Sequence, residues 1–213
     1  MAASGLTSVK LPDGVTSIDS GAFYDCRNLT SVTIPDSVTI IRNDAFEGCT
    51  SLTELTVSES NETFKSYENC IYKKDGNAFI MAASGLTSVT FLEGVTSIDS
   101  EAFRYCRNLT NVTIPDSVSY IDRDAFSHCS LTSVNIPNGI TLIRVSTFFY
   151  CSSLTSVTIP ASVTKIEDSA FGYCNSLTTV NYKGTKEQWD AIKIEVNNDP
   201  IKNATVNYNY TGE

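Results

Sequence analysis

The stretch that decides the fold is LTSVTIPDSVTIIRNDAFEGCTS, residues 29–51. Its pattern, LTSVxIPxxVTxIxxxAFxxCxx, returns every 23 residues and once after 22. Regular units begin at Leu6, Leu29, Leu86, Leu109, Leu131 and Leu154. An irregular 34-residue unit begins at Leu52, and a unit that soon departs from the pattern begins at Leu177. Recurrence at a short fixed period predicts a repeat architecture in which neighbouring units stack.

Each part of the unit has a structural interpretation. In LTSVTI the Val and Ile alternate with hydroxyl residues, which predicts a short strand with its apolar side chains facing inward. The proline that follows ends this strand, and VTxI predicts a second short extended piece. The segment xxAFxxC would bury Ala, Phe and Cys as one helical turn does. One unit cannot bury this face alone, so the sequence predicts a solenoid with a continuous core.

The repeat resembles the BspA-type (Treponema pallidum-like) leucine-rich repeat, with Pro, AF and Cys in register across the regular units. Two positions depart from it, Leu92 in place of proline and Thr147 in place of alanine. The resemblance implies a β-dominated leucine-rich repeat solenoid, a right-handed superhelix of about seven 22–23-residue coils with short helical turns. It also implies a cell-surface or secreted protein, since relatives of this class include adhesins.

Two segments break the period. Residues 57–85 contain β-prone runs around Lys-Lys-Asp-Gly-Asn, which predicts a protruding hairpin inserted into one coil. In the tail, Thr185 and Gln188 form a capping box that opens a short helix, and Trp189 is expected to plug the open core. Asn-Asn-Asp-Pro at 197–200 is expected to turn the chain into a last strand. We therefore expect a solenoid over residues 1–182 and a cap of the same domain over 183–213.

The nine residues MAASGLTSV occur at 1–9 and again at 81–89. Residues 1–50 match residues 81–130 at 35 of 50 positions, which indicates an 80-residue super-repeat. On this interpretation Met1 is an internal methionine at a truncation point, or a start placed there, and the chain is the C-terminal piece of a longer array.

The composition excludes several classes of partner. The net charge is −9, whereas nucleic-acid binding needs a basic face. The sequence has no apolar run long enough to cross a bilayer, so we expect no membrane insertion. We expect a monomer.

The cysteines and the single histidine do not form a recognisable metal-binding or catalytic pattern. Six of the seven cysteines share one repeat position and no CxxC pair exists, which favours buried free thiols and no metal or other cofactor. The single histidine, His128, lies in a slot that holds Asp, Gly or Tyr in other units. Nothing in the sequence directs His128 towards a nucleophile, so we expect no enzymatic activity.

The candidate partner-binding residues form two groups. In four consecutive units the slot before the cysteine is aromatic, and further candidates lie beside it; this first group comprises Arg104, Tyr105, His128, Phe149, Tyr150 and Tyr173. Stacked rings suit a protein or sugar partner, although the simpler interpretation is that they shield one another and the edge of the core. The second group lies in the inserted hairpin and comprises Tyr67, Tyr72, Lys73 and Lys74.

The sequence therefore favours a non-catalytic protein- or glycan-binding repeat module, and the family resemblance implies an adhesin fragment that binds a host or neighbouring cell. The alternative is a structural spacer that displays another domain and has no ligand of its own.

Overall fold

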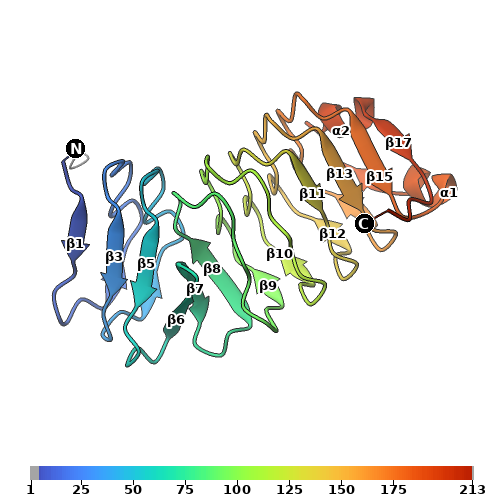
Figure 1. Cartoon of the computed structure of the whole chain (residues 1–213). Coiled ribbons are helices and arrows are strands. Elements are labelled where there is room, and N and C mark those ends of the chain that lie inside the picture. Colours follow the sequence, from blue (N-terminus) through green and yellow to red (C-terminus); the bar gives the residue numbers. More distant parts are fainter. Residues whose placement is uncertain (1–4, 213) are drawn as a thin grey trace.

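The computed structural model describes residues 5–212, so the expectation about Met1 lies outside the described residues. The chain winds into a solenoid whose short strands stack from one end to the other (Figure 1). The N-terminal coil lies at one end and the helices of the C-terminal segment lie at the other. The predicted leucine-rich repeat solenoid is confirmed.

The LTSV segments form two parallel sheets rather than one. The first joins β1 (Ser8–Lys10), β3 (Ser31–Ile34) and β5 (Glu54–Val57). The second joins β11 (Ser133–Asn135), β13 (Ser156–Ile159) and β15 (Thr179–Tyr182), and the last strand expected in the tail, β17 (Thr205–Asn207), adds to its edge. Equivalent residues pair across coils, as Val9 does with Val32 and Val157 with Val180. This register aligns the buried side chains in columns.

The strands expected in the units that begin at Leu86 and Leu109 do not form, because residues 88–91 and 111–114 are not in strands. A strand needs a neighbour about 4.8 Å away to satisfy its backbone groups. Instead, β5 contacts the inserted strands that follow it, and the Gly85 amide is the group that reaches back to the Leu52 carbonyl at 2.8 Å. The insert therefore interrupts this ladder.

The VTxI segments form the second, predicted set of short strands. They are β2 (Ser17–Ile18), β4 (Ile40–Ile41), β9 (Ser97–Ile98), β10 (Tyr120–Ile121), β12 (Leu142–Ile143) and β14 (Lys165–Ile166). In the C-terminal tail β16 (Lys193–Ile194) pairs with β14 and extends this set. They pair in parallel with the buried isoleucines opposite one another, as Ile18 is with Ile41.

No helix forms at the AFxxC segments of residues 5–212, so the expectation of a helical turn there is wrong. Successive backbone amides there donate alternately within the turn and to the next coil. The Cys26 amide donates to the Phe23 carbonyl three residues earlier at 3.1 Å, whereas the Phe23 amide donates to the Ala45 carbonyl of the next coil at 2.8 Å. Left-handed residues recur in each unit, as at Gly21 (φ 63°) and Asp25 (φ 57°), and an α-helix cannot pass through them. Within residues 5–212 helices form only near the C-terminus.

The core consists of stacked columns of Leu, Val, Ile, Phe and Cys. The phenylalanine rings stack directly, with Phe103 and Phe126 at 4.8 Å and Phe148 and Phe171 at 5.3 Å between centroids. The expected continuous core is divided into two clusters, one running from Ile18 to Ala83 and one from Cys70 to Ile201.

The insert causes this division. It forms β6 (Phe64–Tyr67), β7 (Cys70–Lys73) and β8 (Ala78–Ala82), with antiparallel pairing that confirms the predicted hairpin. The hairpin does not protrude, however. Ile71 is buried in the N-terminal cluster, whereas Tyr72 is buried in the C-terminal one. Because alternate residues of a strand point to opposite faces, β7 can serve both halves of the solenoid.

Hydroxyl columns join the coils at the surface. Thr30 Oγ1 donates to the Thr7 carbonyl at 2.9 Å, and Thr155 Oγ1 donates to the Thr132 carbonyl at 3.0 Å. Ser117 Oγ donates to the Val95 carbonyl at 2.7 Å. These bonds explain why the repeat keeps Thr and Ser at surface positions of the unit.

All seven cysteines are free and buried. Their thiols donate across coils, as Cys129 does to the Phe103 carbonyl at 3.0 Å and Cys174 to the Phe148 carbonyl at 3.0 Å. Burial raises the pKa of Cys106 to about 12, which makes its thiolate scarce at neutral pH.

The C-terminal segment closes the core at that end. The predicted capping box opens α1 (Lys186–Asp190), and Trp189 is half-buried against Tyr182 at 5.2 Å. Asn198 and Pro200 start an unexpected second helix, α2 (Asp199–Asn203), whose Ile201 is fully buried. The side-chain oxygen of Asn198 accepts a hydrogen bond from the Phe171 backbone amide, and its side-chain nitrogen donates to the Glu167 carbonyl. No helix within residues 5–212 is long and apolar enough to cross a membrane.

Tyr72→Phe should lower the free energy of unfolding by about 1–2 kcal/mol, because the Leu92 amide would lose its acceptor, the Tyr72 hydroxyl at 3.1 Å. Tyr67→Phe is the matched control. Its side chain is exposed, so its loss should stay within about 0.5 kcal/mol. Urea unfolding measures both, and equal losses would contradict the buried role of the hairpin.

Thiol titration of the unfolded protein without reductant should give close to seven free thiols. The native protein should react far more slowly, because every cysteine is buried. A count of one or three would mean that the column is cross-linked.

Candidate functional site

The slot before the repeat cysteine adopts a left-handed backbone. Its φ angle is 59° at Tyr105, 60° at His128, 59° at Tyr150 and 59° at Tyr173. The first coils fill the same slot with Asp25 and with Gly48, the latter at φ 77°. Glycine adopts this conformation without strain, whereas a bulky side chain rarely does. Four aromatic residues in succession therefore occupy a position that the backbone makes unfavourable for them.

The structure brings these four rings together on adjacent coils, and we call them the aromatic ladder. Tyr105 and His128 stack at 4.3 Å with 6° between their planes. His128 and Tyr150 follow at 4.9 Å and 26°, then Tyr150 and Tyr173 at 5.8 Å and 38°. Phe149 lies beside the ladder and meets the Tyr173 ring edge-on at 5.3 Å. The predicted contact between neighbouring units is confirmed.

Exposure rises along the ladder. Tyr105 and His128 are half-buried, whereas Tyr150 is 48% exposed and Tyr173 is 58% exposed. Because the rings stack on one another, they present mainly their edges and hydroxyl groups outward. Ring edges carry positive partial charge, which suits oxygen acceptors of a partner.

Two arginines lie at the Tyr105 end. Arg104 is half-buried and forms ion pairs with Glu47 at 3.6 Å and Glu101 at 3.5 Å. Its guanidinium carbon lies 5.4 Å from the Tyr105 ring centroid, and that of Arg107 lies at 5.3 Å. Sequence reasoning included Arg104 but missed Arg107. The recurrence of arginine directly after the repeat cysteine, at Arg27 and Arg107, was the signal that could have found it.

A cavity of about 260 Å³ adjoins this end of the ladder. It is lined by Tyr24, Asp25, Arg27, Glu47, Gly48, Thr50, Tyr105 and Arg107. Gly48 occupies the ladder slot here without a side chain, so the cavity lies where another rung would lie. Tyr24, which sequence reasoning also missed, is 56% exposed.

The candidates in the hairpin do not form one surface. Tyr72 is fully buried, so its prediction as a partner-binding residue is wrong. Lys74 Nζ donates to the Asn61 carbonyl at 2.6 Å and the Glu59 carbonyl at 3.1 Å, which ties it to the scaffold. Lys73 is exposed over the Phe64 ring at 4.8 Å, and Tyr67 is exposed at the other end of the β6–β7 pair.

His128 makes ring contacts on both sides, with Tyr105 and with Tyr150. Burial lowers its pKa, and the nearby Arg104 and Arg107 lower it further. The imidazole is therefore a neutral rung of the ladder at physiological pH. Within residues 5–212 no group of three His, Cys, Asp or Glu side chains could hold a metal ion.

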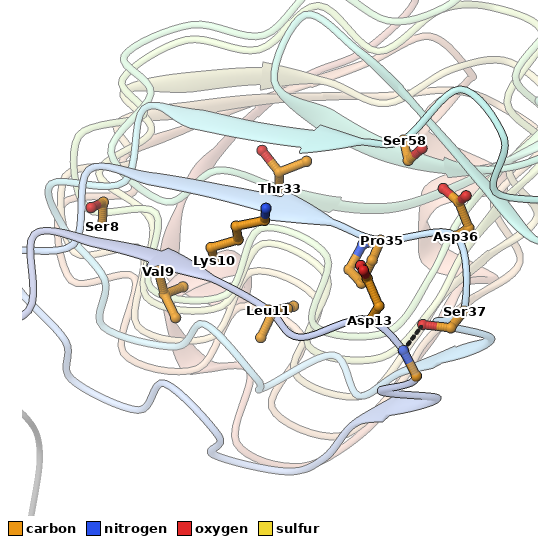
Figure 2. A pocket seen from close by; sticks show the side chains of 11 residues that line it. Ser8, Val9, Lys10, Leu11, Asp13, Thr33, Pro35, Asp36, Ser37 and Ser58 are labelled. Carbon is orange, nitrogen blue, oxygen red and sulfur yellow. Dashed lines mark hydrogen bonds between the residues drawn. The ribbon is translucent and has the colours of Figure 1, made fainter.

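A second cavity, of about 610 Å³, lies over β1 and β3 at the N-terminal end (Figure 2). Apolar side chains line it at Val9 and Leu11, and the Gly14 amide donates to Ser37 Oγ at 3.2 Å. The Lys10 side chain extends towards Thr33 in Figure 2. Among the described residues, its lining combines charged, hydroxyl and aliphatic side chains and contains no aromatic ring, unlike the ladder.

The in-register coils and the exposed ladder define a leucine-rich repeat solenoid that carries an aromatic surface. A family model described as "BspA type leucine rich repeat region" matches residues 2–75 and 74–192. The chain belongs to this BspA-type leucine-rich repeat family.

Solved structures extend the comparison. A leucine rich cell surface protein from Faecalibacterium prausnitzii is 32% identical, with TM-score 0.64 over 88% of this chain and 62% of its own. A leucine-rich repeat protein from Eubacterium ventriosum is 20% identical, with TM-score 0.68 over 83% of this chain and 55% of its own. The pneumococcal vaccine antigen PcpA is 18% identical, with TM-score 0.58 over 86% and 55%. The two latter likenesses show the fold alone. No curated protein matches the chain.

The chain thus spans about three-fifths or less of the length of these solved relatives.

His128→Tyr should make the protein less sensitive to acid. Because the pKa of His128 is lower in the folded state, the unfolded chain takes up its proton first as the pH falls through about 6.5. The stability of the wild type should therefore fall relative to the variant between about pH 8 and about pH 5. Urea unfolding over this range measures the difference, and a pH-independent difference would contradict the prediction.

Proposed function

We propose that this chain is a non-catalytic binding module that contacts a macromolecular partner through the aromatic ladder. The observation that carries the proposal is a row of rings, exposed at Tyr150 and Tyr173, in left-handed backbone slots.

The energies indicate that the ladder does not exist for stability. A left-handed backbone costs roughly 1–2 kcal/mol for a residue other than glycine, and four ladder residues adopt it. A stacked aromatic pair contributes about 0.5–1.5 kcal/mol, and three such pairs lie along the ladder. Summed over the ladder, the backbone cost is larger than the stacking contribution, so mutual shielding offers the fold little advantage. Tyrosine does suit binding, because it supplies contact area with few rotamers to order.

The comparisons support a location on a bacterial cell surface or outside the cell. The Faecalibacterium relative is described as a cell surface protein, and PcpA is described as a vaccine antigen. In this setting the partner would be a protein or glycan on a host or neighbouring cell, and the module would act as a monomer.

A structural spacer is the second candidate. The observation that favours it is the elongated shape, with the two ends of the solenoid far apart (Figure 1), and the hydroxyl columns that join its coils. Such a rod could display another domain without binding anything itself.

The double variant Tyr150→Ala/Tyr173→Ala should weaken binding to immobilised collagen, fibronectin, laminin or a glycan array by about tenfold or more, because two exposed rings are lost. The control is Ile40→Ala/Tyr120→Ala, which removes comparably exposed apolar side chains from another face. Surface plasmon resonance measures the affinities, and circular dichroism checks that both variants fold. Attachment that survives the ladder variant, or no attachment to any of these ligands, would favour the spacer.

A further inference from the structure

The cavity at Gly48 is a missing rung of the aromatic ladder. Tyr105 ends the stacked series, and Tyr24, 56% exposed, also lines the cavity. A Cβ placed on Gly48 would lie 2.8 Å from Asp25 Oδ1, so the space directly above the Gly48 backbone is narrow. At about 260 Å³ the cavity can hold one large side chain, and it lies just below the range of roughly 300–1,000 Å³ that is usual for cofactor sites.

One of the two arginines that line this cavity forms no ion pair with the described residues. Asp25 accepts two hydrogen bonds from Arg27, at 2.8 and 3.0 Å. Glu47 is paired with Arg104 at 3.6 Å. Arg107 forms no ion pair with any of the residues that the structure describes, and its guanidinium lies over the Tyr105 ring. The lining thus holds two arginines and two carboxylates, and Arg107 is the arginine whose guanidinium neither carboxylate binds in an ion pair. Its charge reaches Asp25 only at longer range, where it helps Arg27 to lower the pKa of that carboxyl.

The rings around the site favour a protein partner over a sugar. A sugar binds aromatic residues by laying its flat face on an open ring face. At the rung beside the cavity these faces are covered, since Tyr105 is stacked on His128 and carries two guanidinium groups nearby. The exposed edges and hydroxyls instead suit the carbonyl and carboxylate oxygens of a polypeptide.

We propose that the Gly48 cavity receives an aspartate or glutamate side chain of a protein partner. The carboxylate would pair with the guanidinium of Arg107, which can donate two parallel hydrogen bonds to it. The stem of the side chain would contact Tyr24 and the edge of the Tyr105 ring, both of which line the cavity. The rest of the partner segment would follow the ladder edges towards Tyr173. This inference rests on the proposed binding function and names the partner's chemistry.

The test uses the full chain and random dodecapeptides displayed on phage. Selected peptides should be enriched in Asp or Glu, and Arg107→Gln should weaken their binding by about tenfold or more, as expected for a charge-assisted hydrogen bond. Gly48→Tyr should weaken it similarly by filling the cavity with the residue that the slot holds elsewhere. Replacing the acidic residue of the peptide by its amide should give no further loss in Arg107→Gln.

Matched controls separate the site from general effects. Arg123→Gln removes another exposed arginine, and Gly94→Tyr places a tyrosine at another left-handed glycine with open space around it. Both should bind as the wild type does. Should Gly48→Tyr fail to fold, Arg107→Gln and the peptide variants still decide the outcome.

Other results would overturn the inference. If peptides bind through Tyr150 and Tyr173 but show no acidic preference and no dependence on Arg107, the inference fails and the proposed function stands. If the peptides depend on neither the ladder nor Arg107, both fail. Arg107-dependent binding of acidic glycans on an array, without binding of acidic peptides, would overturn the assignment to a protein partner.

Discussion

The structure depends on in-register stacking between successive coils. A single coil of about 23 residues is apolar on one side and cannot bury that side alone, so every coil needs a neighbour in the same register. Backbone pairing sets this register, and it aligns the Val, Ile, Phe and Cys columns. The same register also arranges the surface, because side chains that recur at one position of the unit form a continuous row along the solenoid. The aromatic ladder is a consequence of the core.

The insert shows how the solenoid tolerates an interruption of its period. Strand β7 replaces direct coil-to-coil contact by a sheet that is buried on both faces, with Ile71 towards one half and Tyr72 towards the other. The insert is connected to the following coil by the pairing of Phe79 with Ile98 and by the stacking of the Phe79 ring on Phe103 at 4.5 Å. The pairing of LTSV strands does not resume until β11, so the strand pairing that connects the two halves runs through β8, β9 and β10 on the other side of the coil.

The left-handed slots connect the scaffold to its candidate site. The turn at AFxxC places a left-handed residue directly before the cysteine in each regular unit, and this requirement directs that side chain outward. Glycine satisfies the turn at Gly48 and leaves a cavity, whereas tyrosine satisfies it at Tyr105 with strain and extends a binding surface. One backbone requirement therefore produces both the ladder and the gap at its end.

The sequence by itself determined the solenoid, its period, the buried cysteine column and the adjacency of Tyr105, His128, Tyr150 and Tyr173, because residues one period apart must lie on neighbouring coils. Only the tertiary structure decided the places where the period fails. An alternating strand does not reveal whether one face or both will be buried, so Tyr72 was mistaken for a surface residue. Backbone handedness and the pairing of Arg104 with Glu47, two units away, also depend on the fold, because neither follows from residue spacing.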